Sequence, residues 1–236
     1  MKKSMKWSAV GICVLILLAA GTYKWMNART FQLFGSLTAE VETNEKIIAI
    51  TFDDGPTENT DEIIATLNDY GAQATFFLVG NEIEKHPDEM KKLIEAGHQI
   101  GNHSYSHERM IFKSSHIYRK EIERTDELIK KAGYQGEIHF RPPFGKKLIG
   151  LPWALHMQGK RTIMWSIEPD SVSSDTDEKV SIVKQKAKPG SILLLHPMYD
   201  KSGQEIKVLD EILSALSKEG YTFVTVNELL QRAGEN

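Results

Sequence analysis

The residues with the clearest chemical potential are two adjacent aspartates and a pair of histidines. Asp53 and Asp54 follow the apolar run Ile47–Phe52, within the sequence TFDDGP. Neighbouring carboxylates repel each other, and either a bound cation or a division into one ligand and one base relieves that repulsion. His103 and His107, in HSYSH, are four residues apart, so on a helical turn they would face one metal ion. A polar turn and two structural histidines are the competing interpretation.

Three further apolar runs end in reactive groups. Arg141 precedes two prolines in RPPFG, and this stiff, extended backbone suits a cation aimed at a carboxylate. His196 ends the buried-looking run LLLH, where a histidine is placed for acid–base work. The segment WSIEPD supplies Trp165, Glu168 and Asp170, which by themselves are a weak signal.

Together these residues indicate a metal-dependent hydrolase. His103, His107 and one of Asp53 and Asp54 would form a two-histidine, one-carboxylate site with room for water. The other aspartate would act as a base, and His196 as a separate acid. The same donor set could hold non-haem iron for oxygen chemistry, but the second aspartate and the distant histidine favour hydrolysis.

A parallel sheet is the scaffold that would bring these residues together. Short apolar runs alternate with amphipathic stretches that are helical in spacing, which predicts parallel strands joined by helices. Function in such folds lies at the carboxyl ends of the strands. Seven strands would form either an open doubly wound sheet or a closed (β/α) barrel, and the pattern leaves both open. The predicted strands are Ile47–Phe52, Ala74–Val79, His98–Asn102, Glu137–Arg141, Thr162–Ile167, Ser191–His196 and Tyr221–Val226.

The helical stretches share apolar residues at helical spacing, and several are followed by glycine, the expected stop signal. They are Thr60–Tyr70, Glu82–Ala96, Ser115–Ala132, Asp177–Ala187 and Ile206–Lys218.

Residues 1–24 form a segment of different character. Lysines precede an uncharged run of 17 residues between Lys6 and Lys24, and a helix of that length spans roughly 25 Å. This is the short end of the membrane-spanning range, and aromatic residues flank it as at membrane interfaces. We expect a membrane anchor with the remainder outside the cytoplasm, or alternatively a signal peptide that is cleaved and leaves a secreted protein. Residues 25–44 are interpreted as a stalk, and 45–236 as the folded domain.

Charge and cysteine content exclude several classes of protein. The first 24 residues carry +4, which leaves −7 for the rest of a chain whose net charge is −3. A nucleic-acid-binding protein would show a basic excess. The one cysteine, Cys13, allows neither an intrachain disulfide nor a cysteine-based metal site.

The order of the motifs resembles the polysaccharide deacetylases, which are carbohydrate esterase family 4 with a NodB-homology domain. TFDDGP, HSYSH, RPPFG and LLLH occur in that family's order over about residues 45–230. The resemblance implies a distorted (β/α)7 barrel. It also implies metal-dependent removal of acetyl groups from N-acetylated sugars.

The resemblance also implies roles for the site residues. Asp53 corresponds to the general base, and Arg141 to the residue that orients it. The ligands of a divalent metal, usually Zn²⁺, would be Asp54, His103 and His107.

Other positions would complete the site. The backbone N–H of Phe144 corresponds to an oxyanion donor, and His196 to the acid that protonates the leaving amine. Leu194 would line the pocket for the acetyl methyl.

One motif departs from the family pattern. The family has an Asp-Trp pair after the fifth strand, where this chain has Ser171 and Val172. Asp170 lies one position earlier and would support His196 after a small backbone shift. Trp165 is the aromatic candidate for contact with the substrate in this segment.

The sequence therefore predicts an extracytoplasmic deacetylase of an N-acetylglucosamine polymer, with peptidoglycan the preferred substrate. Chitin oligosaccharides are the second candidate. A catalytically weakened carbohydrate-binding member of the fold is an alternative from another class. A two-carboxylate glycoside hydrolase fits poorly, because adjacent aspartates do not flank a scissile bond. No protein or nucleic-acid partner is expected.

Overall fold

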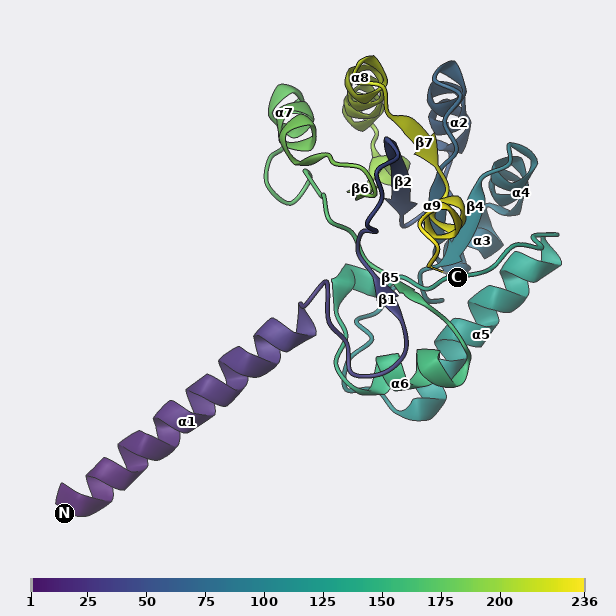
Figure 1. Ribbon diagram of the computed structural model, residues 1–236. Coiled ribbons are helices and arrows are strands. Elements are labelled where there is room, and N and C mark those ends of the chain that lie inside the picture. Colours follow the sequence, from purple (N-terminus) through teal and green to yellow (C-terminus); the bar gives the residue numbers. More distant parts are fainter. Residues whose placement is uncertain (1, 236) are drawn as a thin grey trace.

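Parallel strands form the centre of the structure (Figure 1). The computed structural model describes the backbone of residues 2–235 and the side chains of residues 11–235. One sheet has β2 at its centre, and a separate pair of short strands is formed by β1 (Leu37–Thr38) and β5 (Thr162–Ile163). The members of the larger sheet are β2 (Ile47–Asp53), β3 (Thr75–Leu78), β4 (Gln99–Asn102), β6 (Ile192–Leu195) and β7 (Thr222–Val224).

The sheet closes into a distorted barrel. β2 pairs with β6, with β3 near its carboxyl end and with β7 near its amino end. Isolated parallel bridges join Asn102 to Phe140, Phe140 to Thr162, and Ile167 to Leu193. They carry the pairing from β4 through β5 to β6, so the closed arrangement is the one adopted. In the expected strand Glu137–Arg141, Phe140 provides these bridges, and the prolines that follow lack the N–H groups to continue a ladder.

Helices cover the outside of the barrel (Figure 1). Side chains of Ser114, Asp175 and Thr225 accept backbone N–H groups at the starts of three of them, as N-caps do. The helices are α2 (Thr60–Asp69), α3 (Gly80–Lys85), α4 (Pro87–Glu95), α5 (Ser115–Lys131), α6 (Gly150–Met157), α7 (Thr176–Lys186), α8 (Gln204–Lys218) and α9 (Val226–Arg232).

Two differences from the predicted helices have local causes. The expected helix Glu82–Ala96 is broken into α3 and α4, because Pro87 cannot donate a hydrogen bond and begins a new helix. The helices α6 and α9 were not predicted, since α6 is apolar on both sides and α9 overlaps the end of a predicted strand.

Every residue of β2 is buried, which fits a strand at the centre of the barrel. Alternate side chains enter two apolar clusters, with Ile48 and Ile50 in one and Ile47 and Ala49 in the other. Apolar packing on both faces therefore holds β2, whose carboxyl end carries the two aspartates.

The N-terminal part consists of α1 (Lys2–Met26), which projects from the body in Figure 1, and a packed segment after it. Strand β1 pairs with β5, and Ala39 and Val41 are buried. The range 25–44, expected to be a stalk, thus contains residues of the folded core.

The side chains of residues 1–10, part of the expected anchor 1–24, lie outside the described residues. Among the described residues, no helix has the length and apolarity needed to cross a membrane.

Candidate metal and catalytic site

Asp54, His103 and His107 converge above the carboxyl ends of β2 and β4. His107 Nε2 lies 3.1 Å from Asp54 Oδ1, and His103 Nε2 lies 3.6 Å from the same oxygen. One donor atom from each of the three residues lies within 4.8 Å of the others. Two imidazoles and one carboxylate are a donor set that suits a divalent cation. The three residues therefore form a candidate metal site.

The hydrogen bonding of His103 supports this assignment. Its Nδ1 lies 2.7 Å from the carbonyl oxygen of Arg141, so Nδ1 carries the proton and donates it. The lone pair of Nε2 then faces the other two ligands, which is the usual arrangement for a metal-binding histidine.

The two histidines do not share a helical turn, contrary to the expectation. The segment is an irregular loop in which Ser104 and His107 have φ angles of 66° and 56°. Side chains hold this loop in place: Asn102 Oδ1 accepts the N–H of Ser104 at 2.8 Å. Glu121 Oε2 accepts the N–H groups of Tyr105 at 3.1 Å and Ser106 at 2.8 Å.

Asn102 and Glu121 are therefore positioning residues that sequence reasoning missed. Glu121 lies in a segment correctly predicted to be an amphipathic helix, where a glutamate resembles an ordinary solvated side chain. Nothing in its local pattern points to the histidine loop.

Asp53 is held by a buried arginine. Arg141 Nη1 donates to Asp53 Oδ1 at 2.8 Å, and to Thr51 Oγ1 at 2.8 Å. Its other nitrogens donate to the carbonyl oxygens of Ile163 and Met164, each at 3.2 Å. The guanidinium is fully buried, and the surrounding acceptors fix its orientation. In this orientation it aligns one oxygen of Asp53.

The two aspartates have unlike charge environments. Burial opposes ionisation of Asp53, but Arg141 and nearby histidines outweigh it and lower the pKa of this carboxyl. For Asp54, burial together with the charge of Asp53 raises the pKa despite the opposing effect of His103. Asp53 is thus stable as an anion, whereas Asp54 would be stabilised as an anion by a cation bound beside it.

His196 is paired with Asp170. Its Nδ1 lies 2.9 Å from Asp170 Oδ2, and its backbone N–H donates to the same oxygen at 3.1 Å. The other oxygen of Asp170 lies 2.9 Å from Nζ of Lys179, which also contacts Glu205 at 2.7 Å. Burial lowers the pKa of His196, but the hydrogen bond to Asp170 and the surrounding carboxylates outweigh burial and raise it to about 9.

The remaining candidates surround these groups. The backbone at Phe144 has a φ of 58°, and its half-exposed ring lies 4.8 Å from that of His107 between centroids. Leu194 is buried opposite Thr51 of β2. Trp165 is buried too, and its Nε1 donates to Glu168 at 2.9 Å.

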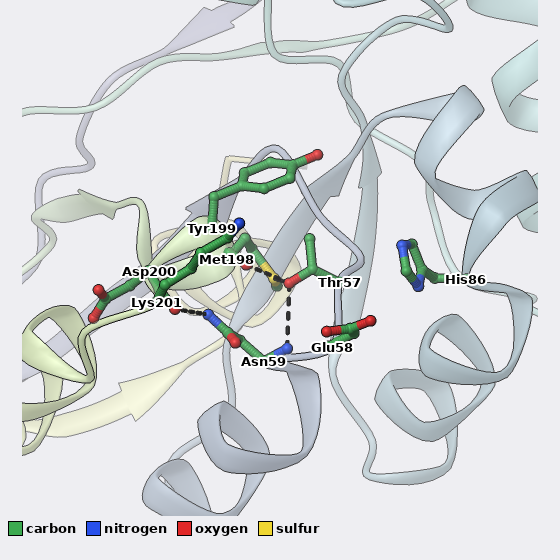
Figure 2. A pocket seen from close by; sticks show the side chains of 8 residues that line it. All are labelled: Thr57, Glu58, Asn59, His86, Met198, Tyr199, Asp200 and Lys201. Atoms are coloured by element: carbon green, nitrogen blue, oxygen red, sulfur yellow. Dashed lines mark hydrogen bonds between the residues drawn. The ribbon is translucent and has the colours of Figure 1, made fainter.

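A pocket of about 190 Å³ adjoins the site, between the loop after Asp54 and the segment after His196. Figure 2 shows the side chains that line it, with Thr57 and Asn59 next to Met198 and Asp200 and joined to that segment by hydrogen bonds. Asn59 Nδ2 donates to the carbonyl oxygens of Pro197 at 2.9 Å and Asp200 at 2.6 Å. These bonds tie the segment that follows the two aspartates to the segment that follows His196.

Comparison with known proteins identifies relatives over most of the chain. The family model described as polysaccharide deacetylase matches residues 40–159. A peptidoglycan-N-acetylglucosamine deacetylase of Bacillus cereus is 36% identical over 84% of this chain and 94% of its own length. The peptidoglycan-N-acetylmuramic acid deacetylase PdaC of Bacillus subtilis is 34% identical over 80% of this chain, but over only 40% of its own length.

A solved structure shares the fold. The wild-type CE4 family pseudoenzyme from Bacillus anthracis superimposes with a TM-score of 0.76 and 26% identity, covering 85% of this chain and 70% of its own. Similarity of this kind therefore extends to a protein described as a pseudoenzyme, and activity depends on the residues of the site.

Proposed function

The chain belongs to the polysaccharide deacetylase family, and we propose that its substrate is peptidoglycan, from whose N-acetylglucosamine residues it removes the acetyl group. The similarity to the peptidoglycan-N-acetylglucosamine deacetylase supports this substrate, because it extends over nearly the whole of that protein. The second relative, named for N-acetylmuramic acid, matches over a smaller share of its length. We therefore propose N-acetylglucosamine, ahead of N-acetylmuramic acid, as the sugar residue that is deacetylated.

The reaction begins with Asp53. It is the carboxylate with the lowered pKa, aligned by Arg141, and its second oxygen lies 3.5 Å from His103 Nε2. An anion in this position takes a proton from the attacking water as the water adds to the acetyl carbonyl. We assign Asp54, His103 and His107 to a divalent cation, for which we propose zinc; when bound, it would polarise the carbonyl and acidify the water.

His196 supplies the proton that the leaving amine needs. With a pKa of about 9, it is protonated at neutral pH and can give a proton to the sugar nitrogen as the C–N bond breaks. The water supplies the oxygen that acetate gains, and the products are acetate and a glucosamine amine. Asp170 orients the imidazole by accepting its Nδ1–H, which leaves the proton on Nε2 available for transfer.

Three residues are proposed to shape the binding site. The N–H of Phe144 is assigned to the oxyanion that develops on the carbonyl oxygen. Leu194 is assigned to the acetyl methyl. Trp165, which is buried, is assigned to the wall behind the site and not to direct stacking on the sugar.

The observation that carries the proposal is the pairing of a buried Arg141–Asp53 unit with the Asp54–His103–His107 cluster. The test is acetate release by the zinc-loaded protein from peptidoglycan fragments, with chitin oligomers and N-acetylmuramic acid compounds as comparison substrates. Faster acetate release from chitin oligomers would show that chitin, and not peptidoglycan, is the preferred substrate. Binding of metal and sugar without acetate release would favour a carbohydrate-binding member of the fold.

We further propose that α1 anchors the protein in the cell membrane, with the domain on the outer side, or serves as an export signal before secretion. The uncharged run between Lys6 and Lys24 supports this location. A tether would keep a domain of net charge −7 close to an anionic cell wall, to which charge alone would not attract it.

A further inference from the structure

A patch of exposed apolar side chains lies beside the end of α1. Its five members come from two segments, and each is between 47% and 65% exposed. The members of this apolar patch are Phe31, Leu33, Ile149, Trp153 and Met157. Scattered exposed apolar residues need no explanation, but a contiguous group marks an interaction surface.

Helix α6 is apolar on two sides. Leu151 and Leu155 pack into the protein, whereas Ile149, Trp153 and Met157 recur every four residues on a different, exposed side. A helix that is hydrophobic all round is normally buried on every side, in a protein core or in lipid. The exposed side of α6 is therefore an apolar surface that no other described part of the domain covers.

The two segments of the patch are joined by direct packing. The rings of Phe34 and Trp153 meet edge to face, with centroids 5.0 Å apart. In Figure 1 the loop that follows α1 passes beside α6, in agreement with this contact. Phe31 and Leu33 precede Phe34 in that same loop, so the two segments of the patch lie next to each other.

The patch also adjoins the point where α1 leaves the domain. The N–H of Lys147 donates to the carbonyl oxygen of Met26 at 3.1 Å, and Lys146 Nζ donates to Asn27 at 3.1 Å. Lys146 Nζ lies 5.5 Å from the centroid of the Tyr23 ring. A lipid surface that surrounds α1 would therefore lie close to the patch.

The charge around the patch suits an anionic surface. No aspartate or glutamate occurs in residues 1–39 or in 138–167, although the domain as a whole is acidic. Lys24 is exposed in the first of these stretches, and Glu168, the acid that follows the second, is neutralised by Arg29 at 2.8 Å. Apolar side chains, a tryptophan and nearby cations are the combination that binds membrane interfaces.

We infer that this apolar patch lies in the interface of an anionic lipid bilayer and fixes the orientation of the domain on the membrane. The inference rests on the proposed anchoring by α1, and it adds a second contact. With both contacts the domain sits on the bilayer in one orientation and does not swing freely from α1.

The test uses spin labels on the full-length chain in vesicles that contain phosphatidylglycerol. One label is placed at Met157→Cys in a Cys13→Ser background. A matched label is placed at Ser181→Cys in the same background, at an exposed site on α7, far from α6 in Figure 1. The label at 157 is expected to be several-fold more accessible to oxygen than to a water-soluble nickel complex, with the reverse at 181.

A third label, on the native Cys13, separates this inference from the anchoring proposal. If the label on Cys13 is in lipid while the label at 157 is as exposed to nickel as the label at 181, the docking inference is wrong and the anchor stands. If the label on Cys13 is in water, the anchoring proposal fails, and lipid contact at 157 would then show the patch binding by itself. Water at both positions overturns both.

Two further measurements distinguish a membrane from another partner. Adding Trp153→Glu should reduce the oxygen-to-nickel accessibility ratio at 157 several-fold, while acetate release from soluble oligomers shows that the variant is folded. Vesicles of phosphatidylcholine alone should lower the same ratio. If Trp153→Glu leaves the ratio at 157 unchanged, the patch does not hold the label in lipid and the inference is overturned.

Discussion

His196 Nδ1 lies 2.9 Å from Asp170 Oδ2, although Asp170 is one position earlier in the chain than the family's usual aspartate. The segment that differs in sequence therefore still delivers a carboxylate to the histidine. Lys179 and the N–H of His196 contact the same carboxylate and hold it in place.

Asp170→Asn should move the alkaline limb of the pH–rate profile to lower pH. The hydrogen bond and charge of Asp170 raise the pKa of His196 to about 9, so their loss lowers it. Since the protonated imidazole is the proposed acid, the variant should lose activity at a lower pH than the parent as the pH rises. Acetate release measured across pH checks this, and an unchanged alkaline limb would show that His196 is not the titrating acid.

Asp53→Asn should abolish catalysis but not metal binding. The amide keeps the shape of the side chain but cannot accept a proton, so the rate should fall by about 10²–10⁴-fold, the usual contribution of a general base. Acetate release and zinc content are measured on the same preparation. Activity within a few-fold of the parent would remove Asp53 from the mechanism.

His103→Ala should remove the metal. His103 is one of the three candidate ligands, and its Nδ1 is already committed to the carbonyl of Arg141. Its loss leaves two ligands for the cation, too few for a closed protein site. Metal analysis after dialysis is the readout, with His116→Ala, an exposed histidine on α5, as the matched control. A stoichiometric metal retained by His103→Ala would contradict the ligand assignment.

Arg141→Met should destabilise the protein and change the titration of Asp53. Removing one member of a buried ion pair leaves an uncompensated charge, which costs about 3–5 kcal/mol. Arg141 lowers the pKa of Asp53, so in the variant this pKa rises and the acidic limb of the pH–rate profile moves to higher pH. In the parent, the stabilisation linked to the lowered pKa of Asp53 is present at neutral pH and is lost as the pH falls through that pKa. In the variant this stabilisation is smaller at every pH, because the carboxylate has lost its main partner.

Thermal unfolding and pH–rate profiles measure the two effects separately. Arg232→Met is a suitable control, because Arg232 pairs with Glu45 at 2.6 Å and with Glu228 at 3.2 Å on the exposed surface and such pairs contribute little. Equal stability losses in the two variants would show that the Arg141–Asp53 pair has no special role.

Much of the fold was predictable because its signals are local. The alternation of apolar runs and amphipathic stretches correctly predicted the strand β2 and the helix α5 to within a residue or two. The helix boundary at Pro87 was not predicted, because the apolar spacing continues past the proline. The strand predicted over Thr162–Ile167 is present as β5, but it ends at Ile163, and its pairing depends in part on residue 140, far away in the chain.

For the site, the sequence by itself determined which groups are available: a pair of aspartates, a pair of histidines, an arginine before prolines and a histidine after an apolar strand. Only the tertiary structure decided how they combine. Arg141 reaches Asp53 across 88 positions of the chain, and Asp170 and Glu121 acquire their partners only when the barrel closes and α5 packs beside the histidine loop. Periodicity reports which side of an element is buried, but a contact between distant elements depends on how the strands are ordered around the barrel, and no local pattern encodes that order.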